Sequence, residues 1–442
     1  MRLSLLIIIV LCLVPHTGFG QDRPTTSSVD AATYALWANQ DWDTLISTGN
    51  EALKQGLDFY YLRYRLGVAW YEKRNYHQAI RHFQAACRMS AEDDVLKEYL
   101  YYSYVYSGRE YEAAYLDDTF STRLRNKLNL ADNSLKQAYI AYSYHPGATS
   151  STTAQFDLST DAEGYQTITT GYHLVNIGLE HRVGSRFWLQ HSYTHLQRNY
   201  FQYYNIGNTS LLNQDDKTYV NQYYLGTTAL IKPGLDIRFG FHYIHLLNYM
   251  SSTIPAPGRP GAFSEPVTNV NFVGFVSLYR RYRYLTAGLS SNIGNVNDAT
   301  QFQQDAMIAL FPFGNLNLYT TSTLSLQTEK MVDKNWRDEL IFHQNIGMKL
   351  SDRIWAEAEA SFGEIMNVIT YDGSVIFNDT DVIKQKYGLS LHTIITPRIH
   401  LRLNYVYYKK ESSFVPSQTG FQVPETIPYS TNSITAVVIW KR

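Results

Sequence analysis

The stretch from residue 235 to residue 250 constrains the fold more than any other, because apolar and polar side chains alternate along it. A period of two residues puts the apolar set on one face of a β-strand and the polar set on the other. Such a strand fits a soluble sheet with one buried face, and it also fits a barrel strand that spans an outer membrane. The apolar set is Leu235, Ile237, Phe239, Phe241, Tyr243, Leu247 and Tyr249, and the polar set is Asp236, Arg238, Gly240, His242 and Asn248.

Fourteen candidate strands follow one another between residues 135 and 442, and their length separates these two alternatives. Most are 11 to 16 residues long, whereas strands of globular proteins cluster near about five or six residues and tilted membrane strands need about nine to eleven. We therefore predict a transmembrane antiparallel up-and-down β-barrel of about 14 strands over residues 135–442.

The connections between these strands alternate in length. Residues 184–185 and 232–234 are tight turns with the residue types that such turns require, whereas residues 201–217, 251–267 and 371–380 are predicted to be longer links. This alternation is typical of outer-membrane barrels, which have short turns at the periplasmic end and longer loops outside. With an even number of strands, the start of the first strand and the end of the last strand lie on the same side of the membrane. Both, and the region before the barrel, are then predicted to lie in the periplasm of a Gram-negative-type bacterium.

The N-terminus carries the features of a secretory signal. Arg2 supplies a positive charge, residues 3–14 form an apolar run, and residues 18–20 (Gly-Phe-Gly) form a small-x-small cleavage site. The apolar run is shorter than the roughly 20 residues that a membrane-spanning helix needs. We therefore predict a cleaved signal peptide over residues 1–20, followed by a tail at residues 21–29.

The chain has two cysteines, and only one of them is expected in the mature protein. Cys12 lies inside the predicted signal and follows the bulky Leu11, which argues against a lipid anchor at that position. Cys87 then remains alone, so the exported chain can form no internal disulfide. We expect burial and strand pairing to hold the fold together.

Residues 30–120 have helical periodicity and contain one well-marked repeat. Its spacing resembles the tetratricopeptide repeat, in which small residues let two antiparallel helices approach and aromatic residues fill the space between them; Ala91 stands where that family has proline. Degenerate copies about 34 residues away on either side indicate two or three repeats, and residues 121–134 are predicted to be a linker. The motif residues are Leu66, Gly67, Trp70, Tyr76, Ala79, Phe83 and Ala86.

The parity of each strand also predicts which side chains face the lumen of the barrel. Residues 354–369 are predicted to form one strand with two inward glutamates, and the next strand is predicted to turn Ile383 toward lipid and its lysines inward. These opposite charges fit a ladder that stabilises strand pairing, or a lining that guides a substrate; an open pore, a plugged pore and a lateral gate are equally compatible. The candidate lumen groups are Glu180, Arg182, Arg238, His242, His343, Glu357, Glu359, Lys384, Lys386, His400 and Arg402.

The composition and the absence of known motifs exclude several classes of protein. A formal net charge of −1 is not that of a nucleic-acid-binding protein, which neutralises phosphates with many Lys and Arg residues. The chain contains no G-x-S-x-G elbow, no Gly-rich phosphate loop and no H-E-x-x-H helix. His191 and His195 share a strand face, but they are too far apart along a strand to form an obvious metal pair. We therefore expect no enzyme activity, no cofactor and no metal.

A helical-repeat module followed by an outer-membrane barrel resembles two families in layout. The surface lipoprotein assembly modifiers combine helical repeats with a fourteen-strand barrel, and the exopolysaccharide export porins combine many repeats with a somewhat larger barrel; the strand count here favours the first. The resemblance implies that the repeats bind a periplasmic protein or peptide client, and that the barrel, surrounded by outer-membrane lipids, assists export or surface display of a protein or polymer. The alternatives are a passive pore and a structural barrel anchored to envelope partners, with the helices as a plug or spacer.

Overall fold

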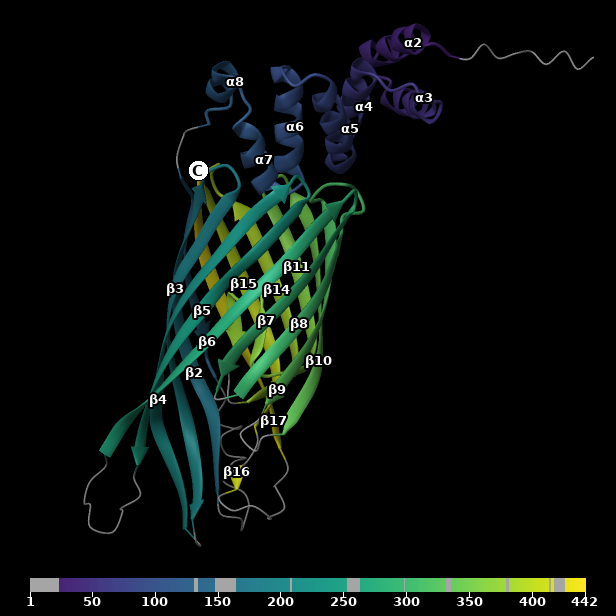
Figure 1. Ribbon diagram of the computed structural model, residues 1–442. Helices are drawn as coiled ribbons and strands as arrows, with labels where there is room; N and C mark the ends of the chain where they lie inside the picture. The colour runs from purple at the N-terminus through teal and green to yellow at the C-terminus, as the bar shows by residue number, and fades with distance from the viewer. Residues whose placement is uncertain are drawn as a thin grey trace, which may run out of the picture.

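The computed structural model describes residues 24–130, 134–147, 164–206, 209–252, 263–297, 299–330, 335–378, 381–412, 415–416 and 426–442. The predicted signal peptide at residues 1–20 lies outside these residues. The described chain has a helical region followed by a barrel of strands, and the helices lie over one end of the barrel (Figure 1). No helix of the described residues combines the length and the apolar character that a membrane-spanning helix requires.

Seven helices precede the barrel in the described residues, and six of them form three successive hairpins. The first helices of the hairpins begin at residues 26, 60 and 94, which is a period of 34 residues. We call the region from α2 to α8 the helical cap. Its helices are α2 (Thr26–Ala38), α3 (Trp42–Lys54), α4 (Tyr60–Glu72), α5 (Tyr76–Met89), α6 (Asp94–Tyr106), α7 (Glu110–Asp117) and α8 (Thr122–Lys127).

Side chains at the start of each helix and small residues between the helices explain this arrangement. Asp41, Asn75 and Asp93 each accept a hydrogen bond from a backbone N–H in the first turn of the helix that follows, which satisfies donors that would otherwise lack a partner. Gly67 lies against Phe83, and a Cβ atom at Gly67 would stand 2.4 Å from that ring. The motif glycine therefore lets α4 and α5 approach closely.

Two predicted boundaries of the helical cap are wrong. The predicted linker at residues 121–134 contains α8, whose first turn is capped by the Ser121 hydroxyl. The predicted tail at residues 21–29 contains the start of α2, where Thr25 and Ser28 form a reciprocal capping box. Local hydrogen bonds by serine and threonine side chains extend the helical region beyond the segment in which apolar periodicity is evident.

Fourteen strands form a closed antiparallel barrel, as predicted. Each strand pairs with its neighbours in the chain, and β1 closes the ring by pairing with β17; the two-residue strand β16 (Val415–Pro416) also pairs with β2. The barrel strands are β1 (Leu135–His145), β2 (Gly164–Val183), β3 (Phe187–Ile206), β4 (Thr209–Lys232), β5 (Leu235–Ser252), β6 (Phe263–Tyr282), β7 (Leu285–Val296), β8 (Ala299–Leu310), β9 (Leu318–Lys330), β10 (Trp336–Ser351), β11 (Ile354–Ile365), β14 (Val382–Ile394), β15 (Ile399–Ser412) and β17 (Ile427–Lys441).

The faces of these strands follow the predicted parity. On β5, Phe239 and Tyr243 are 44% and 39% exposed, whereas Asp236 and His242 on the opposite parity are buried. Large apolar side chains are exposed in the same way on strands all around the ring, such as Leu289 and Leu340. An apolar outer surface around a closed set of strands is the surface of a membrane-spanning barrel, since no backbone edge is left unpaired in lipid.

Several predicted links are continuations of strands. Strands β3 and β4 run through most of the predicted link at residues 201–217, and β5 and β6 extend into the predicted link at residues 251–267. These strands are up to 24 residues long, more than the about nine to eleven that span a bilayer, so the barrel wall continues beyond the membrane on the side away from the helical cap (Figure 1).

Candidate functional site

The predicted end of the strand at residues 354–369 is wrong, and the reason defines the candidate site. Strand β11 ends at Ile365, and the chain then forms a short hairpin from β12 (Val368–Thr370) and β13 (Val375–Phe377) before β14 begins. Gly363 has a φ of 123° and Asn367 a φ of 58°, so the backbone twice leaves the extended conformation there. Apolar residues continue around these two positions, with Ile365, Met366, Val368 and Ile369, which is why the sequence alone suggests one uninterrupted strand.

This hairpin, residues 366–378, crosses the lumen, and we call it the lumen hairpin. It begins between β11 and β14 and its tip contacts β4 and β5, which lie on the far side of the ring. Val368 packs with Ile341 and Ile383, whereas Ile369 packs with Val273 and Val296. A hairpin with an apolar core on both sides occupies the lumen at this level, so the barrel is filled there.

Side-chain amides of the wall pair with the backbone of the lumen hairpin. The Gln303 amide accepts from Ile369 N at 2.9 Å and donates to Ile369 O at 2.6 Å. Gln301 donates to Asn367 O at 3.0 Å, and Gln327 donates to Met366 O at 3.0 Å. These contacts replace the water that an isolated backbone segment would need, and they fix the stem of the hairpin to β8 and β9.

The tip of the lumen hairpin is held by charged and hydroxyl groups. The Asp372 carboxylate accepts hydrogen bonds from Arg238 Nη1 at 2.9 Å, Ser277 Oγ at 2.6 Å and Tyr279 OH at 2.7 Å. Tyr224 OH donates to Asp372 O at 3.1 Å, and the His242 ring binds Gly373 O at 2.8 Å. Two of the predicted lumen groups, Arg238 and His242, therefore bind the hairpin and do not line an open passage.

The predicted pairing of acidic and basic strands is present in the wall. Glu359 of β11 lies 2.8 Å from Lys386 Nζ of β14 and 3.8 Å from His343 of β10. The Tyr371 hydroxyl of the lumen hairpin donates to the same carboxylate at 3.2 Å. Glu357 accepts a hydrogen bond from Tyr319. Glu359 is thus shared between the wall and the hairpin, whereas Glu357 binds a tyrosine of the wall strand β9.

The predicted outward orientation of Ile383 is wrong. Its side chain is buried beside Val368 of the lumen hairpin, because a bulge between Ile383 and Gln385 shifts the register of β14 against β15. Lys384, next to that bulge, pairs with Glu364 at 2.5 Å and with Glu411 at 3.2 Å. A single inserted residue reverses the faces on one side of it relative to the other, here those before Gln385, and apolar alternation alone does not reveal it.

The remaining predicted lumen groups lie at the end of the barrel that carries the helical cap. Arg182 pairs with Asp117 at 2.8 Å and with Asp118 at 2.7 Å, both from the cap. His400 contacts His392 at 3.0 Å, and Arg402 lies near His392. Glu180 lies near Glu110 of α7 and Lys441 of β17. Arg182 therefore holds the cap on the barrel.

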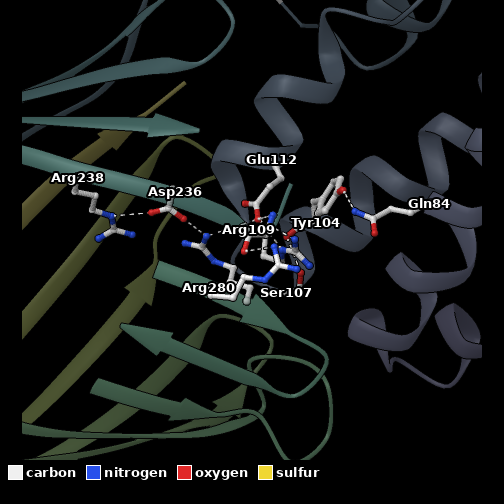
Figure 2. Close-up of polar contacts among 10 residues, drawn as sticks. Gln84, Tyr104, Ser107, Arg109, Glu112, Asp236, Arg238 and Arg280 are labelled. Carbon is white, nitrogen blue, oxygen red and sulfur yellow. Dashed lines mark hydrogen bonds and ion pairs between the residues drawn. The ribbon is translucent and has the colours of Figure 1, made fainter. Parts of the chain in front are cut away.

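A buried ion-pair network joins the helical cap to the barrel. Glu112 of α7 is 1% exposed, and its Oε1 accepts from Arg109 Nε at 2.9 Å and from Gly234 N of the β4–β5 turn at 3.2 Å. Arg281, near the end of β6, lies 3.7 Å from the same oxygen and also pairs with Asp236. Figure 2 shows Glu112 and Arg109 of the cap beside Asp236 and Arg238 of β5.

The same network continues into the lumen. Asp236 Oδ2 lies 3.2 Å from Arg238 Nε, and Arg238 Nη1 binds Asp372 of the lumen hairpin. Arg238 also stands 4.3 Å above the centre of the Tyr279 ring. A continuous series of ion pairs therefore runs from α7 to the tip of the lumen hairpin.

A second contact region fixes α5 to the turns of the barrel. The His77 ring donates to Arg283 O in the β6–β7 turn, and His77 N donates to Gly314 O at 3.1 Å. Asn75 and Gln78 each donate to the Tyr284 hydroxyl at 3.0 Å. Burial lowers the pKa of His77 to about 4, although the carbonyl of Arg283 opposes this shift. His77 is therefore neutral at pH 7.

Eight tyrosines form a continuous row of ring contacts across α4, α5 and α6, which we call the tyrosine row. Its members are half-buried, except for Tyr61 and Tyr106, which are exposed. Burial, followed by the nearby Glu72 and Glu98 carboxylates, raises the pKa of Tyr99, so these carboxylates lie beside the row. The row comprises Tyr60, Tyr61, Tyr64, Tyr71, Tyr76, Tyr99, Tyr102 and Tyr106.

The motif residues of the predicted repeat lie in the core of the helical cap. Leu66, Ala79, Phe83 and Ala86 are fully buried, Gly67 is buried, and Trp70 and Tyr76 are half-buried. His191 and His195 do not meet each other: His191 contacts His181 at 2.7 Å and His195 contacts Asn221 at 2.9 Å. Within the described ranges, no group of three or more His, Cys, Asp or Glu residues could hold a metal ion.

The lumen hairpin is the main element that the sequence did not predict. Its one sequence signal is the run Tyr371-Asp372-Gly373 between two apolar pairs, which is the composition of a hairpin turn. That run lies inside a predicted link, and no local pattern indicates that a link folds into the lumen.

Comparisons with known proteins find similar solved structures but no family. No protein-family model and no curated protein sequence matches the chain. Among solved structures, the P. putida toluene transporter TodX is similar at 10% sequence identity and a TM-score of 0.45. The match covers 71% of this chain and 91% of the TodX chain. A Pseudomonas aeruginosa FadL homologue gives the same coverage, with 11% identity and a TM-score of 0.40. The translocator domain of the autotransporter NalP from Neisseria meningitidis covers 77% of this chain with 99% of its own, at 13% identity and a TM-score of 0.32. Similarity at this level carries no argument about what the chain does.

Proposed function

We propose that this chain is an outer-membrane barrel protein whose helical cap lies in the periplasm and binds a client, while the barrel assists export or surface display of that client. The observation that carries the proposal is that two elements close the barrel. The lumen hairpin fills it from within, and the helical cap lies over the end that has the short turns (Figure 1). Short turns face the periplasm in outer-membrane barrels, and the predicted signal peptide supports the same location.

The helical cap has the spacing of a tetratricopeptide stack. Its hairpins repeat every 34 residues, which is the period of that repeat, and the motif residues pack between α4 and α5 as the resemblance implies. Repeat stacks bind partners on the extended concave surfaces that their curvature creates. In this cap, α4 and α6 are the first helices of two successive hairpins, and they carry most of the tyrosine row.

The tyrosine row is the docking surface that we propose for the client. Tyrosine rings provide large rigid contact area and hydroxyl donors at low entropic cost. With Glu72 beside them, they favour a segment that carries Lys or Arg, because aromatic faces and carboxylates both attract a cation. We therefore propose an extended, basic peptide segment of a periplasmic protein as the occupant.

A binding experiment on the intact chain tests this proposal. A fluorescent Lys- and Pro-containing peptide should bind in anisotropy titrations, and the same peptide with Glu for Lys should bind at least tenfold more weakly. Combining Tyr61→Ala with Tyr106→Ala should weaken binding of the first peptide about tenfold, or about 1.4 kcal/mol. Tyr34→Ala, an exposed tyrosine of α2 outside the row, is the matched control and should bind normally.

Equal binding of the two peptides, or equal loss with Tyr34→Ala, would contradict the docking surface. In cells, deletion of residues 30–116 should abolish surface display of any client that depends on the protein. Unchanged display after that deletion would contradict the export role. The proposal assigns no catalytic step to the chain, and covalent labelling by a hydrolase-directed probe would argue against it.

A passive pore is the competing function, and the lumen hairpin argues against it. Its contacts reach from β11 and β14 across to β4 and β5, which leaves the lumen occupied at that level. A permanently open channel should conduct ions steadily in a planar bilayer. We expect the intact chain to remain closed for most of the recording.

A further inference from the structure

We infer that Arg238, Ser277 and Tyr279 form a binding site for a carboxylate in the lumen, and that Asp372 of the lumen hairpin occupies this site as a built-in ligand. A client that presents a carboxylate would compete with Asp372 and release the tip of the hairpin. We call the three residues the lumen receptor. The inference deepens the proposed transport function, because it names the chemical group that the passing client presents.

The geometry of the lumen receptor is that of a carboxylate site. Arg238 binds one oxygen of Asp372, and Ser277 and Tyr279 donate to the other. A guanidinium and two hydroxyls, all donating at 2.6 to 2.9 Å, satisfy both oxygens of the acid with charge-assisted hydrogen bonds. The three donors come from β5 and β6, whereas the ligand comes from a different segment of the chain.

The lumen receptor is held in place without Asp372. Arg238 is positioned by Asp236, whose carboxylate lies 3.2 Å from Nε, and by the Tyr279 ring beneath it. Asp236 is completely buried and is itself paired with Arg281. A rigid wall that holds its donors in a fixed position provides a site that can exchange one carboxylate for another.

The charge balance of the network indicates an anionic ligand. The linked groups are three carboxylates, Glu112, Asp236 and Asp372, and three guanidinium groups, Arg109, Arg238 and Arg281. Withdrawal of Asp372 leaves this network with three guanidinium groups and two carboxylates, so that Arg238 and Arg281 share Asp236. Buried positive charge in excess of its carboxylate partners is unfavourable, so the vacant site favours an incoming anion.

The backbone at the tip of the lumen hairpin has a conformation that needs outside contacts to hold it. Tyr371 and Asp372 have φ angles of 52° and 53°, in the left-handed region that ordinary residues avoid. Such a conformation persists where the turn and the surrounding contacts impose it; at this position the contacts are those of the lumen receptor, together with Tyr224 and His242, which bind Asp372 O and Gly373 O. Loss of the Asp372 side-chain contacts therefore removes three of the restraints on the tip.

Channel recordings of the intact, purified chain in a planar bilayer test the inference. The unchanged protein should be mostly closed. Asp372→Ala and Arg238→Met should each raise the open probability at least tenfold, because each breaks the same pair. Ser374→Ala is the matched control, since Ser374 lies in the same turn and its hydroxyl donates to Tyr371 O within the hairpin; it should behave as the unchanged protein.

The ligand class is tested on the Asp372→Ala protein, in which the site is vacant. Its currents should prefer anions over cations in a salt gradient, and millimolar acetate at constant ionic strength should reduce them. Adding Arg238→Met to Asp372→Ala should remove both effects. Inorganic phosphate is the comparison anion, and reduction by phosphate alone would show that the site does not select a carboxylate.

Two results would overturn the inference. The first is an open probability of Asp372→Ala equal to that of the Ser374→Ala control, with circular dichroism showing an intact barrel. The second is an equal effect of acetate with and without Arg238. No peptide client takes part in these recordings, so the docking surface on the helical cap can fail while the lumen receptor stands, and the reverse holds as well.

Discussion

Acidification should weaken the attachment of the helical cap to the barrel. The lowered pKa of His77 gives the size of the loss in stability. The ring is buried between α5 and the β6–β7 turn, where it donates to Arg283 O, and its pKa is lowered from 6.5 to about 4. A lowered histidine pKa means that the undocked, unfolded state binds the proton more readily than the native state. The contribution to stability is therefore complete above pH 6.5 and is lost as the pH falls from 6.5 toward 4.

The two pKa values give the size of the effect. At pH 5 nearly every exposed His77 would be protonated, whereas the native one would remain mostly neutral, and the difference corresponds to about 2 kcal/mol. His82, whose pKa burial lowers to about 3, adds a loss of the same sign within the cap. The cap as a whole should therefore be less stable at pH 5 than at pH 7.5.

The variant that isolates His77 is His77→Asn. Asparagine can still donate to Arg283 O from its amide, but it does not titrate in this range. Urea unfolding of the cap, followed by its helical circular-dichroism signal in the intact chain, should show a loss between pH 7.5 and pH 5 that is about 2 kcal/mol smaller in the variant. An identical pH dependence in the two proteins would refute the assignment to His77.

Two further substitutions test the joint and the core of the cap. Glu112→Gln leaves Arg109 without its charged partner in a buried site, so the cap should lose about 3 kcal/mol of stability, measured by the same urea titration; a change below about 0.5 kcal/mol would mean that the pair is solvated. Gly67→Ala places a methyl group 2.4 Å from the Phe83 ring and should cost about 1 to 3 kcal/mol through overpacking, seen as a lower cap melting temperature with an unchanged barrel. Wild-type melting of that variant would argue against close approach of α4 and α5.

The sequence predicts the barrel well because its strands carry a local signal. A period of two residues determines which side chains face lipid, and tight turns such as Lys232-Pro233-Gly234 mark where each strand ends. The positions of Phe239 and His242 on opposite faces of β5 follow directly from that period. The core of the cap follows from the spacing of Gly67 and Phe83 in the same way.

The candidate site was harder to predict because it depends on contacts between distant parts of the chain. Asp372 and Arg238 form an ion pair although 134 residues separate them in the sequence. No local sequence pattern predicts a contact over that separation. The bulge that turns Ile383 inward inserts one residue without changing the apolar character of the strand. Arg182 is predicted to face inward from its parity, but its partners Asp117 and Asp118 come from the cap, a region whose docking only the folded structure reveals.

The closure of the ring between β1 and β17 has a consequence for how the protein is made. The first strand of the wall finds its second neighbour only in the last strand, which ends at Lys441. Until that strand is present, two rows of backbone amides and carbonyls would face lipid unpaired, at a cost of several kcal/mol for each group. Synthesis interrupted before residue 427 therefore leaves a sheet with open edges, and the wall becomes stable in the bilayer only when the final segment is complete.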